Sequence, residues 1–307
     1  MRCANAGKGN KVPANFLGKL LGRRAQAKPA LAEAIADLER LARERPSLAS
    51  AAALLRDVLP LVCGISVREQ PPAIPAERAA GKLAKGVPLL RGEPVDLDDR
   101  AFRRRWQDVC AAIERHRQDK TGRALAEALD RGRLDARHLF QETLAGHARA
   151  IHARAGELGL DVGLAALALR LTLLPILTHF SETLAPLGSG LAWQPGFCPT
   201  CGSWPLLAEV RGLDQLRFLR CGLCAAEWEY PRLQCPFCGT QDHRLLGYFH
   251  AEGEESRWRA ATCDACRGYV KTISTLGALS ISALLIADLA TMHLDLAAGE
   301  GGYAVPL

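Results

Sequence analysis

The chain has 307 residues and a formal net charge of +6, and 49% of its residues are hydrophobic and 23% charged. A chain of this length can bury a sizeable core and favours two domains. The charged, glycine and proline contents are those of ordinary globular proteins, and the modest positive charge does not by itself predict nucleic-acid binding.

No secretory signal is expected from the amino-terminal residues. Arg23 and Arg24 could begin a twin-arginine signal, but residues 25–46 carry many charged side chains and no apolar stretch. A basic start to a helix is the better interpretation. Eleven cysteines in a chain without an export signal indicate a cytoplasmic protein, in which unpaired thiols stay reduced.

A helical domain is expected over residues 29–190, after a flexible arm at residues 1–28 that is rich in Gly, Asn and Lys. Apolar residues recur at steps of three and four from Leu31 to Leu41, which predicts a helix that ends by Pro46. A second helix over residues 48–59 would form an antiparallel hairpin with the first. This hairpin begins a helical bundle.

Residues 70–99 hold many of the chain's prolines and predict a linker-like crossing with one helical turn near residues 76–85. The next long helix is expected to begin at Asp98 or Asp99. Shorter helices should follow at residues 121–129 and 136–157.

The segment Val162 to Phe180 needs testing as a membrane span because it is strongly apolar. It carries Arg170 and His179, is interrupted by Pro175 and is short for a bilayer. We therefore expect a buried core helix with Asp161 as its amino-terminal cap, and no membrane span.

The pair Cys-x-x-Cys occurs four times between residues 198 and 266. Two thiolates three positions apart can hold one metal ion from a tight turn, and two such pairs complete a tetrahedral site. Four pairs therefore predict two metal ions. The eight candidate ligands are Cys198, Cys201, Cys221, Cys224, Cys235, Cys238, Cys263 and Cys266.

Turn chemistry suggests how these pairs combine. The first and third pairs share the form Cys-Pro-x-Cys-Gly, and each is followed, after an interval suited to a β-hairpin, by a pair without Pro. The simplest arrangement is two consecutive ribbons over residues 191–275. Strands are expected at Trp204–Val210, Leu216–Arg220, Leu245–His250, Arg257–Ala261 and Gly268–Thr275.

Metal binding is favoured over disulfides or catalytic dithiols, since paired turns at ribbon spacing are typical of metal sites. All eight ligands are sulfur, so both zinc and iron are acceptable. Four thiolates leave no open coordination position, which disfavours hydrolytic metal catalysis. Each ribbon is small, and we expect bound metal to contribute much of its folding free energy.

Residues 276–307 are expected to form a carboxy-terminal helix over residues 281–296 and then a tail. The predicted fold is mostly α with a small β component. It consists of an amino-terminal helical bundle, two consecutive rubredoxin-like or zinc-ribbon four-cysteine modules and this carboxy-terminal helix.

The cysteine region resembles the formate dehydrogenase accessory protein family of the FdhE type. Matching motifs extend from Phe197 to about Tyr303, whereas the helical body resembles the family more weakly. The matching motifs are Cys-Pro-x-Cys-Gly-Ser-x-Pro from Cys198, Leu-Arg-Phe-Leu-Arg-Cys from Leu216, Cys-x-x-Cys-x-x-Glu-Trp from Cys221, Cys-x-x-Cys-x-x-Tyr-x-Lys from Cys263, Ala-Asp-Leu-Ala from Ala287, Leu294-Asp295 and Gly302-Tyr303. The second cysteine turn of each ribbon lacks the glycine that follows the first: Ala225 follows Cys224, and Arg267 follows Cys266.

The resemblance implies a cytoplasmic, non-enzymatic maturation factor. Such a factor would bind the catalytic subunit of a formate dehydrogenase and promote its assembly or activation before export. The family's association with rubredoxin-type iron favours iron over zinc.

Two other functions remain open. Rubredoxin-type iron could make the protein an electron carrier, and paired zinc ribbons could bind nucleic acid. Acidic residues at 227, 229, 252, 254 and 255 argue against nucleic acid, because phosphate would repel them. No Ser/His/Asp arrangement, phosphate loop or paired-carboxylate site is evident in the sequence.

Overall fold

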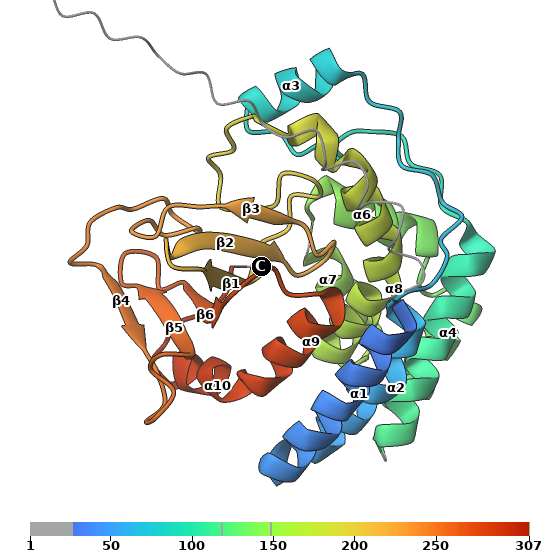
Figure 1. Ribbon diagram of the computed structural model, residues 1–307. Helices are drawn as coiled ribbons and strands as arrows, with labels where there is room; N and C mark the ends of the chain where they lie inside the picture. Colours follow the sequence, from blue (N-terminus) through green and yellow to red (C-terminus); the bar gives the residue numbers. More distant parts are fainter. Residues whose placement is uncertain (1–26, 118, 148, 307) are drawn as a thin grey trace, which may run out of the picture.

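A computed structural model describes residues 27–117, 119–147 and 149–306. The predicted arm at residues 1–28, with Arg23 and Arg24, lies almost entirely outside the described residues. The remainder forms a helical body beside a β-sheet, with the last two helices covering one face of that sheet (Figure 1). This arrangement confirms the predicted fold class.

The helical body begins with the predicted hairpin, α1 (Ala27–Glu44) and α2 (Ala49–Val62), joined by a 3-10 turn at Pro46–Leu48. α2 packs on α4 (Asp99–His116), and α4 packs on α5 (Thr121–Asp130) and α8 (Val162–Leu184). The remaining helices of the body are α3 (Ala76–Ala84), α6 (Ala136–Ala145) and α7 (Arg149–Glu157), followed by a 3-10 turn at Ala185–Gly188.

Helix α4 illustrates why these residues form a bundle. The Asp98 carboxylate accepts a hydrogen bond from Ala101 N at 2.9 Å, which caps the helix. Phe102 and Trp106 lie one turn apart on its fully buried stripe. The Trp106 indole donates to the carbonyl of Leu125 in α5 at 3.1 Å, so this buried polar group is satisfied.

Helix α8 has the length and apolar composition of a membrane span, as does the bent pair of carboxy-terminal helices, by those two criteria alone. Within the fold, 61% of the apolar window of α8 is buried against other elements. Asp161 caps it as predicted, accepting from Leu164 N at 2.9 Å. The packing is that of a central core helix.

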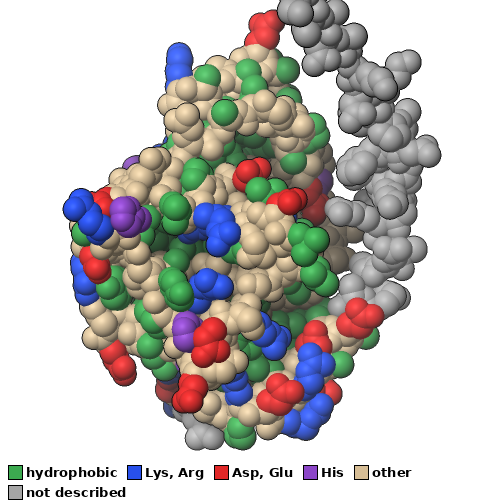
Figure 2. Space-filling model, turned by 60° about the vertical axis from the view of Figure 1, so that its left-hand side comes forward, with side chains coloured by type: hydrophobic (Ala, Val, Ile, Leu, Met, Phe, Trp, Pro, Cys, Tyr) green, Lys and Arg blue, Asp and Glu red, His purple; other side chains and the backbone are tan. Residues whose placement is uncertain are grey.

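The two ribbons form one six-stranded sheet of order β3-β2-β1-β6-β5-β4. β1 and β6 pair in parallel, with Leu207 opposite Lys271, and every other neighbouring pair is antiparallel. β4 is an edge strand at the left of Figure 1 and comes forward in Figure 2. The strands are β1 (Pro205–Arg211), β2 (Leu216–Cys221), β3 (Glu227–Glu229), β4 (Leu246–Phe249), β5 (Trp258–Cys263) and β6 (Tyr269–Thr275).

The carboxy-terminal region differs from the single helix and tail expected for it. α9 (Ile281–Ala290) and α10 (Met292–Glu300) are separate helices that meet at 46°. At the break, the Thr291 hydroxyl is buried and donates to the carbonyl of Ala287 at 2.7 Å. The chain then returns to the sheet, where Ala304 forms a parallel bridge with Gly268.

Candidate metal centres

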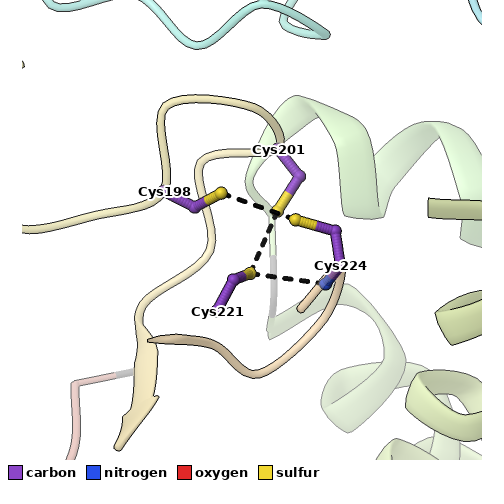
Figure 3. Close-up of side chains that lie close together, drawn as sticks. All are labelled: Cys198, Cys201, Cys221 and Cys224. Atoms are coloured by element: carbon purple, nitrogen blue, oxygen red, sulfur yellow. Dashed lines mark hydrogen bonds between the residues drawn. The ribbon is translucent and has the colours of Figure 1, made fainter. Parts of the chain in front are cut away.

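The first four-cysteine cluster brings Cys198 and Cys201 against Cys221 and Cys224 (Figure 3). Its sulfur atoms lie within 4.8 Å of one another, and the distances from Cys198 to Cys224 and from Cys201 to Cys221 are 3.5 and 3.4 Å. Four sulfurs around one ion at about 2.3 Å would be separated by about 3.8 Å, close to these values. A disulfide would need about 2.05 Å, so these sulfurs are not bonded in pairs.

The second cluster joins Cys235 and Cys238 with Cys263 and Cys266. The Cys235–Cys266 and Cys238–Cys263 sulfur distances are both 3.7 Å, which fits a tetrahedral ion. The pairing is consecutive, as the turn chemistry predicted. The two groups could therefore bind two metal ions, and the sulfur ligands alone accept zinc or iron.

Each cysteine pair is held by the same backbone turn. The N–H of the leading cysteine donates to the carbonyl five residues later, for example from Cys198 to Ser203 at 2.9 Å and from Cys263 to Gly268 at 2.9 Å. The corresponding bonds at Cys221 and Cys235 are 2.9 and 3.0 Å. This repeated turn points both sulfurs of a pair to one side.

Positive φ angles follow the second cysteine of every pair. Gly202 and Gly239 adopt 81° and 75°, as their lack of a Cβ allows. Ala225 and Arg267 adopt 55° and 58° in the turns without glycine, which is unfavourable for these residues. Leu223 N and Cys224 N still approach the Cys221 sulfur at 3.3 and 3.4 Å, so the missing glycine does not prevent the N–H to sulfur contacts.

The thiols of the first cluster cannot all ionise without a cation. Hydrogen bonding from Cys198 raises the pKa of Cys201 well above its usual value, and burial does the same for Cys224. For Cys221, burial acts upward, but hydrogen bonds from the three other sulfurs lower its pKa overall. A bound divalent ion would supply the charge that lets all four become thiolates.

The first cluster is fully enclosed. All four cysteines are buried, and Leu89 N and Leu90 N of the proline-rich crossing donate to the carbonyls of Pro199 and Thr200 at 2.8 and 2.9 Å. On the other side, Arg170 of α8 donates to the carbonyl of Gly222 at 2.8 Å. The helical body therefore covers this site on two sides.

The second cluster is half open. Cys235 and Cys263 are buried, whereas Cys238 and Cys266 are exposed to solvent. The two sites share a ligand set and a turn geometry but differ in access, which the spacing of the cysteines did not predict.

The family motifs beyond the cysteines meet behind the second ribbon. Lys271 of β6 is buried, and its Nζ contacts Asp288 of α9 at 2.6 Å and Asp295 of α10 at 2.7 Å. Tyr269 donates to Asp295 at 2.9 Å. These residues attach both carboxy-terminal helices to the sheet, a structural role that the motifs did not reveal.

A second buried ion-pair network was missed by sequence reasoning. Glu209 of β1 is completely buried and pairs with Arg220 of β2 and, at 2.8 Å, with Arg211. Leu279 N also donates to this carboxylate at 3.1 Å, and Arg220 donates to the Leu279 carbonyl at 2.9 Å. The network anchors the segment that leads into α9. An alternation of Glu and Arg along neighbouring strands was its only sequence indication.

Comparison with known proteins shows similarity to one family. Family models described as "FdhE, central domain" and "FdhE, C-terminal domain" match residues 197–232 and 233–305. The chain is 40% identical over 109 residues to a Protein FdhE homolog from Stutzerimonas stutzeri, covering 34% of this chain and 35% of that protein. It is 33% identical over 114 residues to a homolog from Aquifex aeolicus, covering 36% and 40%. The matched region thus spans between a third and two fifths of these relatives.

The likeness to a solved structure extends further. The crystal structure of the FdhE protein from Pseudomonas aeruginosa aligns over 90% of this chain and 92% of its own, with a TM-score of 0.60 and 25% sequence identity. The similarity therefore includes the helical body as well as the cysteine region.

Proposed function

Because the chain belongs to the FdhE family, we propose that it is an accessory protein for a formate dehydrogenase. It would bind the catalytic subunit of that enzyme in the cytoplasm and promote its assembly or activation before export. The observation that carries this proposal is the pair of four-cysteine clusters, all eight members of which lie in the region matched by the family models.

Each cluster would hold one ion through its four cysteines, so the eight predicted ligands would hold two ions. Iron of the rubredoxin type is the proposed metal, with zinc as the alternative. Four thiolates around an ion leave no position for substrate, which supports a role in assembly rather than catalysis. Anaerobic purification followed by elemental analysis should return two metal atoms per chain, and a red, reducible chromophore would identify iron.

The partnership can be tested by co-purification. Tagged protein should retain the catalytic subunit of the formate dehydrogenase from the same organism, and a strain lacking the protein should lose most formate dehydrogenase activity. A Cys266→Ser variant, expected to keep the enclosed first site, would show whether the second site is needed for this activity. Failure of the unaltered protein to retain the subunit, together with full activity in the deletion strain, would refute the proposal.

Electron transfer is a second candidate because the second cluster is open to solvent. Exposed Cys238 and Cys266 would place a bound iron near the surface, where electrons could pass to a partner. Metal replacement distinguishes the two: protein loaded with zinc, which has no redox chemistry, could not carry electrons, but as an assembly factor it would still activate its partner.

A further inference from the structure

A groove lies over the seam where the two ribbons join. Along β6, Tyr269 and Lys271 face α10 and α9, so the alternating residues Val270 and Thr272 point to the opposite face, where they line the groove. The segment from Arg232 to Phe237, which connects the ribbons, lines one side. The cavity has a volume of about 220 Å³, and Cys235 and Cys263 of the second cluster lie in its wall.

Three arginines line this groove: Arg217 of β2, Arg232 of the connecting segment and Arg259 of β5. No Asp or Glu is among its lining residues. Throughout the part of the chain that the structure describes, other arginines of the ribbons, such as Arg211 and Arg220, form ion pairs, whereas these three form none. The groove therefore gathers three arginines that pair with no carboxylate of the described residues, and Cys235, Cys263 and Tyr248 are the only other ionisable groups among its lining residues.

Arg217 is the most unusual of the three because its side chain is buried. The residue is 6% exposed, and its Nη1 donates only to backbone carbonyls, those of Pro231, Arg232 and Gln234, at 3.3, 3.4 and 3.1 Å. Its Nε is buried and has no hydrogen-bond partner among the described residues. Burial lowers the pKa of Arg217 to about 10, so the group remains charged at neutral pH. A buried guanidinium with no carboxylate partner and an unpartnered Nε favours an incoming carboxylate.

Large apolar side chains border the charged groove. Leu233 and Tyr248 are 69% and 63% exposed, and the Arg259 guanidinium lies 5.2 Å from the centre of the Tyr248 ring. Figure 2, in which the β4 edge comes forward, shows basic side chains between hydrophobic ones in the middle of this face. Exposed aromatic and apolar groups beside arginine are typical of protein interfaces.

We propose that the groove binds a carboxylate side chain presented by an acidic segment of a protein partner. The three arginines would supply the counter-charge, and Leu233 and Tyr248 would contact apolar side chains on either side of the carboxylate. A volume of about 220 Å³ is smaller than the roughly 300–1,000 Å³ of ligand pockets, which suits one or two side chains rather than a nucleotide chain. The identity of the partner as the formate dehydrogenase catalytic subunit rests on the proposed function.

The first test measures binding of fluorescein-labelled poly-glutamate to the full chain, with poly-glutamine and a single-stranded DNA as competing probes. The Arg232→Glu/Arg259→Glu variant should bind poly-glutamate at least ~10-fold more weakly, because two groove charges are reversed. The control, Arg131→Glu/Arg244→Glu, changes the net charge equally at side chains that are 67% and 79% exposed and outside the groove. It should lose much less affinity.

Circular dichroism and metal content must match those of the unaltered protein in both variants. Equal losses in the two variants would mean that poly-glutamate binds by net charge alone and would overturn the groove assignment. Preferential, groove-dependent binding of the DNA would overturn it in favour of a phosphate site.

The second test compares both variants for retention of the formate dehydrogenase catalytic subunit. Loss in the groove variant alone supports the proposal. Equal retention by the two variants refutes the groove as its docking site while leaving the proposed function intact. If even the unaltered protein fails to retain the subunit and the deletion strain keeps full activity, the proposed function fails, and the poly-glutamate comparison still decides whether the groove binds carboxylates.

Discussion

Gly196, which precedes the Cys198–Cys201 turn, lets the backbone of that turn approach the Cys235–Cys238 turn closely. A Cβ at this position would overlap the carbonyl oxygen of Pro236 and lie 2.6 Å from its Cα, and backbone atoms cannot move aside as a flexible side chain can. We expect Gly196→Ala to lower the free energy of unfolding by about 1–3 kcal/mol, the usual cost of overpacking. Urea unfolding of the metal-loaded protein, followed by tryptophan fluorescence, measures this change.

Gly81→Ala is the matched control. Gly81 lies in α3, where a Cβ would have nothing within 4 Å, and its backbone is that of an ordinary helix. Alanine there should stabilise the protein by up to about 1 kcal/mol through helix propensity. If the two substitutions had the same effect, the close approach at Gly196 would not be what limits that site.

Lys271 offers a second test at the level of single residues. Its ammonium group is buried between Asp288 and Asp295, whose side chains are 25% and 34% exposed. Lys271→Met should cost about 2–3 kcal/mol, somewhat less than for a fully buried pair because the two carboxylates retain some water. The cost is measured by urea unfolding.

A compensating change checks the reason for that cost. Asp288 keeps Arg170 at 3.6 Å, whereas Asp295 is left without a cation among the described residues. Lys271→Met/Asp295→Asn removes that carboxylate, so it should recover part of the lost stability. No recovery would indicate that lost packing of the lysine stem, rather than uncompensated charge, explains the single variant.

Among the secondary-structure elements, the segment after α10 packs against the fourth cysteine turn, which belongs to the second cluster. Tyr303 donates to Asp264 at 2.6 Å, and the Arg267 guanidinium lies 4.0 Å from the centre of the Tyr303 ring. Ala304 N donates to the carbonyl of Arg267 at 2.8 Å. Because Arg267 adopts a positive φ that is unfavourable for its residue type, these contacts help hold the fourth cysteine turn in place.

We expect Tyr303→Ala to release metal from the second site several-fold faster than the unaltered protein. Tyr303→Phe removes only the hydrogen bond, worth about 0.5–1.5 kcal/mol, and keeps the stacking on Arg267. Its release rate should lie between the other two. A coloured thiol-compatible chelator follows the release, and identical rates in all three proteins would exclude a role for this segment.

The turns and most of the strands could be predicted from the sequence, whereas the order of the strands in the sheet could not. The candidate ligands and their grouping follow from spacing within short turns, and five of the strands follow from local patterns. The parallel pairing of β1 with β6 joins residues about sixty positions apart, and no local pattern specifies it. β3 is only three residues long and lacked a pattern. The covering of Pro199 and Thr200 by residues 89–90 is a backbone contact, which carries no side-chain signature.

At the scale of the whole molecule, the two clusters belong to different structural surroundings. Cys198, Cys201, Cys221 and Cys224 are part of the main core, which continues into α4 and α8. The second cluster does not belong to that core, and two of its cysteines are exposed. Loss of the first ion should therefore disturb the core, whereas loss of the second should remain local.

This asymmetry leads us to expect two phases of metal release when the loaded protein is treated with a chelator under native conditions. The exposed second site should lose one equivalent first. The enclosed first site should lose the other slowly, because its release requires Leu89 and Leu90 of the proline-rich crossing, or α8, to move away. Cys266→Ser should abolish only the fast phase. Its far-UV circular dichroism should stay close to that of the unaltered protein, whereas Cys201→Ser should lose helical signal as well as metal.

A single phase releasing both equivalents would mean that the two ribbons open together. The shared β1–β6 seam, rather than the covering by the helical body, would then control access to both ions.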